Sequence, residues 1–151
     1  MTFHRILVPV DYSQNSAASL RFAADLAQVH GASLDIVHVW DRPTYVTEEV
    51  LVRHGSGSRP FAELIRENAE KDMRDFLSEV ALPADLPRDE RLVSGDPATA
   101  LLKELEKGHH DLVVVGTHGR SGFSLLMLGS VAEKLVRHAP VPVLTVPPAR
   151  K

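Results

Sequence analysis

The sequence contains no cysteine, which excludes a disulfide framework, a thiol nucleophile and any zinc or iron–sulfur site with cysteine ligands. It also lacks a long hydrophobic run, since no apolar segment approaches the roughly 18 residues of a membrane span. The apolar segment Ile6–Val10 is followed at once by Asp11, and it is shorter than the h-region of a signal peptide, which has about 7–15 residues. We therefore expect a soluble cytoplasmic protein with no membrane partner.

A strong net charge of either sign is also absent. The 151 residues include 17 Lys plus Arg and 20 Asp plus Glu, which gives a formal net charge of −3, and the pI is about 6.2. A dedicated nucleic-acid-binding domain usually has a pI above about 9, so we expect no nucleic-acid partner. Charged residues make up 25% of the chain, as in ordinary globular domains, which argues against disorder. The length corresponds to a single domain over residues 1–151.

Short apolar runs alternate with segments of helical periodicity. The runs with the length of β-strands are Ile6–Val10, Leu34–Val39, Arg91–Val93, Leu112–Val115 and Val141–Val146. The segments with an apolar residue every three or four positions are Ser13–His30, Pro60–Ala81, Asp96–Gly108 and Ser130–His138. This alternation predicts an α/β fold, a single-domain open five-stranded parallel sheet with helices on both faces. The long connection over residues 41–59 contains Gly55-Ser56-Gly57-Ser58 and is interpreted as a flexible loop.

Ligands of open parallel sheets bind outside the carboxyl ends of the strands. The richest such segment follows the fourth strand and runs thirteen residues, from Gly116 to Leu128, whereas a simple connection has about 2–6. Gly116 and Gly119 permit a tight turn, and Gly129-Ser130 stands at the start of a predicted helix. The first backbone N–H groups of a helix have no partner within it and attract anions. The set predicts a phosphate site.

The G-x2-G-x9-G-[S/T] spacing of Gly116, Gly119 and Gly129-Ser130 resembles the motif of ATP-binding universal stress proteins. The chain is similar to that family over nearly its whole length. Further similar segments are Ile6–Ser13 (first strand and turn), Val37–Val39 (end of the second strand), Gly95–Pro97 (turn before the third helix) and Pro140–Val146 (last strand). The resemblance implies a Rossmann-like fold of the adenine nucleotide α-hydrolase-like type.

The resemblance also implies how an adenine nucleotide would be held. Val39 would contact the adenine edge through its backbone, Gly116 and Gly119 would line the path of ribose and phosphates, and the segment Gly129–Val131 would bind the phosphates. Pro9 and Asp11 would flank the nucleoside. The full implied set is Pro9, Val10, Asp11, Val39, Val115, Gly116, Gly119, Arg120, Gly129, Ser130 and Val131.

Several of these residues have an alternative, purely structural interpretation. Asp11 could be a turn residue that bonds its own backbone, and Ser130 with Glu133 has the spacing of a capping box. Arg120 and Ser121 could reach the phosphates or lie in solvent. Asp96 before Pro97 is interpreted mainly as a helix cap.

The eight histidines do not predict a metal site. His109 and His110 are adjacent, so on an extended chain they point to opposite faces, and they precede the fourth strand, at the edge away from the predicted site. His118 lies in the glycine loop and is interpreted mainly as a loop residue.

No catalytic machinery is evident in the sequence, which has no P-loop, no G-x-G-x-x-G and no G-x-S-x-G motif. The family resemblance implies a dimeric, nucleotide-dependent stress-response module that binds ATP with Mg²⁺ or Mn²⁺ bridging the phosphates, and that hydrolyses ATP slowly at most. Its homodimer would form through the last strand, Val141–Val146. Alternatives are a cyclic AMP-binding stress protein, a weak ATPase or nucleotide hydrolase, and an interaction protein without nucleotide.

Overall fold

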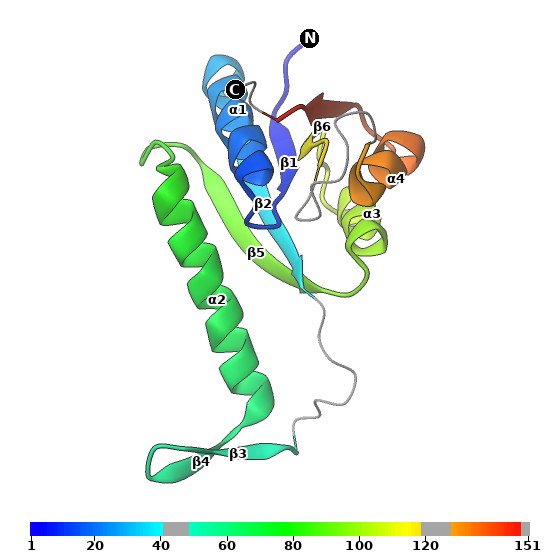
Figure 1. Cartoon of the computed structure of the whole chain (residues 1–151). Helices are drawn as coiled ribbons and strands as arrows, with labels where there is room; N and C mark the ends of the chain where they lie inside the picture. Colours follow the sequence, from blue (N-terminus) through cyan, green and yellow to red (C-terminus); the bar gives the residue numbers. More distant parts are fainter. Residues whose placement is uncertain (41–48, 119–127, 149–151) are drawn as a thin grey trace.

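The computed structural model describes residues 1–40, 49–118 and 128–148 and has the predicted alternation of strands and helices (Figure 1). Its elements in chain order are β1 (Arg5–Pro9), α1 (Gln14–His30), β2 (Ser33–Trp40), β3 (Leu51–His54), β4 (Gly57–Pro60), α2 (Phe61–Val80), β5 (Arg88–Ser94), α3 (Pro97–Lys107), β6 (Leu112–Gly116), α4 (Ser130–His138) and β7 (Val143–Val146).

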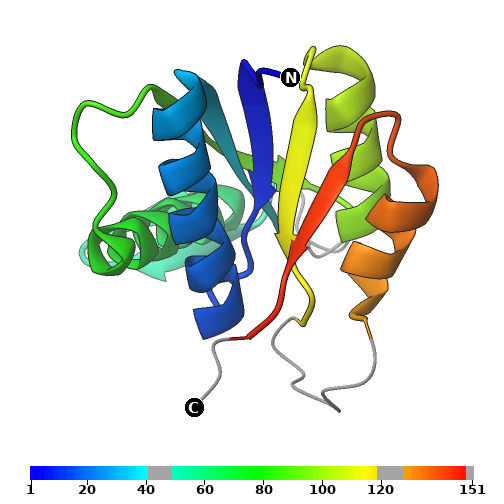
Figure 2. The same ribbon diagram turned by 90° about the horizontal axis from the view of Figure 1, so that it is seen from above.

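Five strands form one parallel sheet in the order β5-β2-β1-β6-β7. The chain builds outward from β1 to β2 and β5, and then returns to the other side of β1 for β6 and β7. Figure 2 shows α1 and α2 on one face of the sheet and α3 and α4 on the other. The predicted α/β fold with a five-stranded parallel sheet and helices on both faces is therefore confirmed.

The centre of the sheet is apolar on both faces because helices cover both. Ile6, Leu7 and Val8 of β1 are all 0% exposed. Ile6 and Val8 pack against α1 and α2, whereas Leu7 packs against α3 and α4. A strand with two buried faces needs a continuous apolar run rather than an alternating one, which is the pattern that this sequence shows.

Capping residues mark the ends of α1 and the start of α3. Ser13 caps α1, accepting a hydrogen bond from the backbone N–H of Ser16, and Gly31 ends this helix in the left-handed conformation at φ 67°. Asp96 caps α3, which has Pro97 in its first turn. The strand limits differ slightly from the prediction: β5 begins at Arg88 and β7 at Val143.

The predicted flexible loop over residues 41–59 is wrong in its second half. Strands β3 and β4 pair as an antiparallel hairpin, and Gly55 takes φ +63° in its turn. That conformation suits glycine, so the Gly-Ser composition here marks a tight turn. Arg59 of β4 forms ion pairs with Glu63 and Glu67 of α2, which tie the hairpin to the helix. Residues 41–48 lie outside the described part of the chain.

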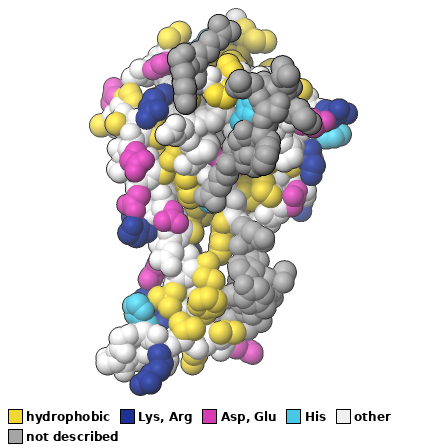
Figure 3. Space-filling view, in the orientation of Figure 1, with side chains coloured by type: hydrophobic (Ala, Val, Ile, Leu, Met, Phe, Trp, Pro, Cys, Tyr) yellow, Lys and Arg dark blue, Asp and Glu magenta, His cyan; other side chains and the backbone are white. Residues whose placement is uncertain are grey.

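The hairpin and the N-terminal half of α2 project from the body of the molecule (Figure 1). Hydrophobic side chains gather over this projection in the space-filling view (Figure 3). Two of the exposed ones are Val50 and Leu51, at 39% and 62%. Only the C-terminal half of α2 contributes buried residues to the core, namely Met73, Phe76 and Val80.

Candidate functional site

A cavity of about 260 Å³ opens at the carboxyl ends of β1, β2 and β6, and the N-terminal turns of α3 and α4 contribute its remaining wall. It lies where the strand order reverses between β1 and β6, the position at which open α/β sheets bind ligands. Every predicted site residue within the described ranges lines this cavity: Pro9, Val10, Asp11, Val39, Val115, Gly116, Gly129, Ser130 and Val131.

Two predicted site residues, Gly119 and Arg120, lie outside the described residues, as does Ser121. The role of the others toward a nucleotide stays a prediction at this point. Sequence reasoning assigned no site role to five other residues that line the cavity, namely Ser16, Val37, Pro97, Leu101 and Ala132. Spacing could have indicated two of them, because Val37 shares a strand face with Val39 and Leu101 follows Pro97 by one helical turn.

Gly116 lies where a side chain would collide with its surroundings. A Cβ atom at this position would be 2.6 Å from Asn15 Nδ2 and 3.3 Å from the Asn15 carbonyl oxygen. Asn15 Nδ2 in turn donates a hydrogen bond of 2.7 Å to the carbonyl oxygen of His118, across 103 positions of sequence. Glycine therefore lets α1 hold the start of the loop after β6 close to the sheet. No pattern in the sequence indicates Asn15.

The N-terminus of α4 faces the cavity, and its N-cap residue is a glycine. This residue, Gly129, has no side chain and therefore gives the first turn no side-chain cap hydrogen bond. The predicted alternative, a capping box with Ser130 as its cap, is therefore wrong, because Ser130 is already the first helical residue. The Gly129 N–H donates to the carbonyl oxygen of Thr117 at 2.6 Å. The next backbone N–H groups, which have no acceptor within a helix, can serve an anion.

Asp11 supplies the charged side chain among the described lining residues. Its Oδ1 accepts a hydrogen bond of 3.0 Å from the backbone N–H of Ser13, so the predicted turn role is present. The Asp11 N–H donates to Ser16 Oγ at 3.4 Å. These contacts fix the carboxylate at the cavity wall, where it can accept hydrogen bonds from ligand hydroxyl groups.

Asp96 acts as the helix cap that the sequence predicts. Its Oδ1 accepts hydrogen bonds from Thr99 Oγ1 at 2.6 Å and from the Thr99 N–H at 3.0 Å. The Thr99 hydroxyl first, and then its N–H, hold the pKa of Asp96 below the ordinary value. This carboxylate is occupied by its own helix, whereas Pro97 beside it lines the cavity.

The walls divide the cavity chemically. Val37, Val39, Leu101 and Val115 form an apolar interior, the start of α4 presents backbone donors, and Asp11 presents an acceptor. Such a cavity suits a ligand with an apolar part, hydroxyl groups and an anionic end.

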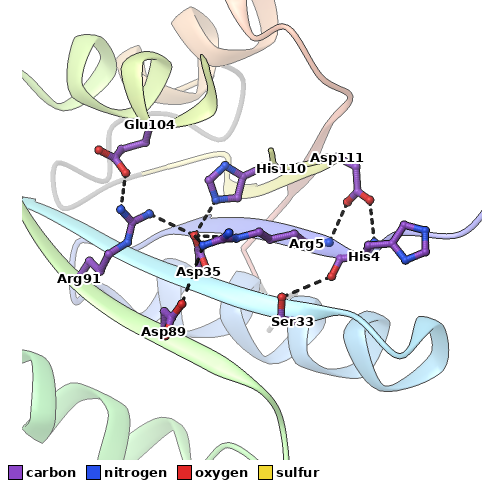
Figure 4. A network of polar contacts seen from close by, with 9 residues as sticks. All are labelled: His4, Arg5, Ser33, Asp35, Asp89, Arg91, Glu104, His110 and Asp111. Carbon is purple, nitrogen blue, oxygen red and sulfur yellow. Dashed lines mark hydrogen bonds and ion pairs between the residues drawn. The ribbon is translucent and has the colours of Figure 1, made fainter. Parts of the chain in front are cut away.

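His110 lies at the opposite, amino end of the strands, in a polar network drawn in Figure 4. It is buried, with Nε2 2.7 Å from Asp35 Oδ2, which gives it a structural partner. Within the described ranges, no group of three or more His, Asp or Glu is arranged to hold a metal ion. No helix there is long and apolar enough to cross a membrane.

Comparison with known proteins finds relatives in both sequence and fold. The chain is 35% identical over 149 residues to a putative universal stress protein of Staphylococcus haemolyticus, covering 97% of this chain and 86% of the relative. The fold matches the universal stress protein UspA of Lactobacillus plantarum at a TM-score of 0.71 and 24% identity, over 97% of this chain and 99% of that one.

A further solved structure is a universal stress protein in complex with cAMP. It is 25% identical, with a TM-score of 0.62, and the alignment covers 97% of this chain and 98% of that one. The model of the universal stress protein family matches residues 2–147. The chain therefore belongs to the universal stress protein family.

Proposed function

We propose that the chain is an ATP-binding universal stress protein, a dimeric module whose nucleotide occupancy regulates what it presents to partners. The observation that carries this proposal is the cavity that joins an apolar interior to the N-terminus of α4, whose N-cap residue is a glycine. A relative of the same fold has been solved with cAMP, which supports an adenine nucleotide as the ligand class.

The residues of the cavity fit such a ligand. Val39 stands at the end of β2, where its backbone can meet the edge of adenine, and Asp11 can accept from a ribose hydroxyl. The N–H groups of Ser130 and Val131 and the Ser130 hydroxyl would bind phosphate oxygens. The absence of a side chain at Gly129 lets the phosphates approach that helix end. Mg²⁺ or Mn²⁺, bound with ATP, would neutralise part of the phosphate charge near Asp11.

The last strand supports the dimer. β7 is an edge of the sheet, and its residues, Val143–Val146, are only half-buried. An apolar edge strand with open backbone groups invites pairing with another strand. If β7 of a second copy paired with it in the antiparallel direction, the exposed backbone N–H and C=O groups of both edge strands would form hydrogen bonds with each other.

A thermal-shift experiment with Gly129→Asp tests the site. Gly129 has φ −60° and ψ 151°, which any residue can adopt, and Asp is a favoured N-cap residue. The variant is therefore expected to fold at least as stably as the wild type, while its carboxylate repels phosphates. With ATP and Mg²⁺ at a hundred times the dissociation constant, the wild type gains about 2.7 kcal/mol, or roughly 5–10 °C in Tm.

Gly129→Asp should lose this shift. The matched control is Gly57→Asp, because a Cβ atom at Gly57 would meet no heavy atom within 4 Å and this residue lies on the hairpin. It should keep the full shift. A shift retained in Gly129→Asp would overturn the phosphate assignment, and a larger shift with cyclic AMP than with ATP would change the proposed nucleotide.

A further inference from the structure

We propose that a second cavity, between α2 and the end of β2, binds a small organic cation. Its volume is about 400 Å³, within the range of small-molecule sites. It is lined by three aromatic rings, three aliphatic side chains, one amide and one carboxylate: Tyr12, His38, Trp40, Val39, Ile65, Ala69, Asn68 and Asp72. The proposal goes beyond the nucleotide site and does not depend on it.

The regular geometry of two elements builds this cavity. His38 and Trp40 are two positions apart on β2, so their side chains share one face of the sheet. Ile65, Asn68, Ala69 and Asp72 form a single stripe of α2, because their spacing follows the turns of the helix. The strand end and the helix stripe thus face each other.

The core does not fill the space between them. The buried residues of α2 are Met73, Phe76 and Val80, all C-terminal to the stripe. Toward its N-terminus the helix leaves the body of the protein (Figure 1), and Ile65 and Ala69 are only half-buried. Apolar side chains on this stretch therefore face a space that a ligand can enter.

Contacts with neighbouring residues hold two rings of the aromatic wall, those of Tyr12 and His38. The Tyr12 and His38 rings stack with centroids 4.1 Å apart and an angle of 25° between their planes. His38 Nδ1 is 2.8 Å from the Val10 carbonyl oxygen, and the Tyr12 ring also lies 5.3 Å from that of Phe76. Tyr12 has φ 65°, an unusual conformation for a bulky residue. Such backbone strain concentrates at functional sites.

The negative charge of the cavity lining favours a cationic ligand. Asp72 is its carboxylate, and no lysine or arginine is among the described lining residues. Lys71, the neighbouring cation on α2, pairs with Asp75 at 2.5 Å. Within the described chain, Asp72 itself has no ion-pair partner within 4 Å. A carboxylate beside Trp and Tyr rings is the chemistry that recognises an ammonium group with an apolar body.

The two cavities are chemically separate. They share only Val39 among their lining residues, and β2 separates them because alternate side chains point to opposite faces. One offers backbone donors to an anion, whereas the other offers aromatic rings and a carboxylate to a cation. Success or failure of one site therefore leaves the other unaffected.

Trp40 is the single tryptophan of the chain, so its fluorescence reports on this cavity directly. The probe is choline, and its comparison is 3,3-dimethylbutan-1-ol, which has the same shape without the charge. Choline should change the Trp40 emission saturably, and the neutral alcohol should bind at least about tenfold more weakly. This comparison needs no variant.

Asp72→Asn should weaken choline binding by about fivefold, the size expected for an exposed ion pair. The matched control is Asp75→Asn, which makes the same change one helical turn away, outside the lining, and should leave the affinity unchanged. Gly129→Asp should also keep it. The proposal is overturned if choline gives no saturable change, if the neutral alcohol binds equally well, or if both Asp variants behave alike.

Discussion

His110 and Asp35 are 75 positions apart in the sequence, yet His110 Nε2 lies 2.7 Å from Asp35 Oδ2 in the protein interior. Their side chains are 0% and 1% exposed. The same carboxylate oxygen is 2.8 Å from Arg5 Nη2 and 3.1 Å from Arg91 Nη2 (Figure 4). One buried charge therefore connects β1, β2, β5 and the segment that leads into β6.

Asp35→Asn should destabilise the fold. The substitution keeps the shape of the side chain but removes the charge that compensates two guanidinium groups, and breaking a buried ion pair costs about 3 kcal/mol. Urea unfolding at pH 7 measures the loss. Asp89→Asn is the matched control, because Asp89 is 3.9 Å from the same Arg5 atom but 71% exposed. The control should change stability by less than about 1 kcal/mol, and an equal loss in both variants would contradict the role of burial.

The stability of the fold should depend on pH through the ionisation of the Asp35 carboxyl group. Burial, the largest influence, raises its pKa, but hydrogen bonds from Arg5 and His110 and their charges outweigh burial, so the net pKa is lowered from 3.8. The ionised group therefore stabilises the fold above its unfolded pKa, about 3.9. That contribution is lost as the pH falls through the lower folded value. Urea unfolding from pH 7 downward should show the difference in stability between the wild type and Asp35→Asn shrinking as the pH falls. A constant difference between them would exclude this linkage.

The sheet could be predicted from the sequence because strands and helix ends are each marked by residues that are close together in the chain. Ile6, Leu7 and Val8 reveal a strand with two buried faces, and Ser13 and Gly31 mark the two ends of α1. The hairpin over residues 51–60 was missed because its strands have exposed, mixed side chains and a Gly-Ser turn that also suits a flexible linker. Composition alone does not separate these two structures.

The lining of the cavity could be predicted as far as the sheet topology brings the ends of strands together. Asp11, Val39 and Gly116 each follow or end a strand, so a parallel sheet must place them at one edge. Asn15 and Asp35 could not be found this way. Their partners lie 103 and 75 positions away, and neither residue type nor spacing indicates such a pairing.

Gly116→Ala should perturb the loop that follows β6. The new Cβ would come within 2.6 Å of Asn15 Nδ2, which must then move and lose its hydrogen bond to the His118 carbonyl oxygen. The expected loss of stability is about 1–2 kcal/mol, with weaker ATP binding in a calorimetric titration. Gly57→Ala, where a Cβ meets nothing within 4 Å, is the control. Adding Asn15→Ala should relieve the clash, so an additive double variant would argue against this contact.

The proposed dimer can be tested at β7, because the backbone N–H and C=O groups of successive residues in a strand point alternately to its two sides. The Val113 N–H donates to the Pro142 carbonyl oxygen and the Thr117 N–H donates to that of Val146. Backbone groups of the even-numbered residues therefore face β6, and those of Thr145 face the open edge. Thr145→Pro removes an N–H group that the sheet itself does not use.

Light scattering should consequently find Thr145→Pro monomeric, because proline removes one bond from an intermolecular ladder and obstructs the approach of a second strand. Thr145→Val keeps the N–H group and the side-chain shape, so it should remain dimeric like the wild type. The ATP-dependent thermal shift should persist in both variants, since Thr145 does not line the cavity. A dimeric Thr145→Pro variant would place the contact on another surface. A wild type that is monomeric at micromolar concentration would instead leave nucleotide binding as a property of the single chain.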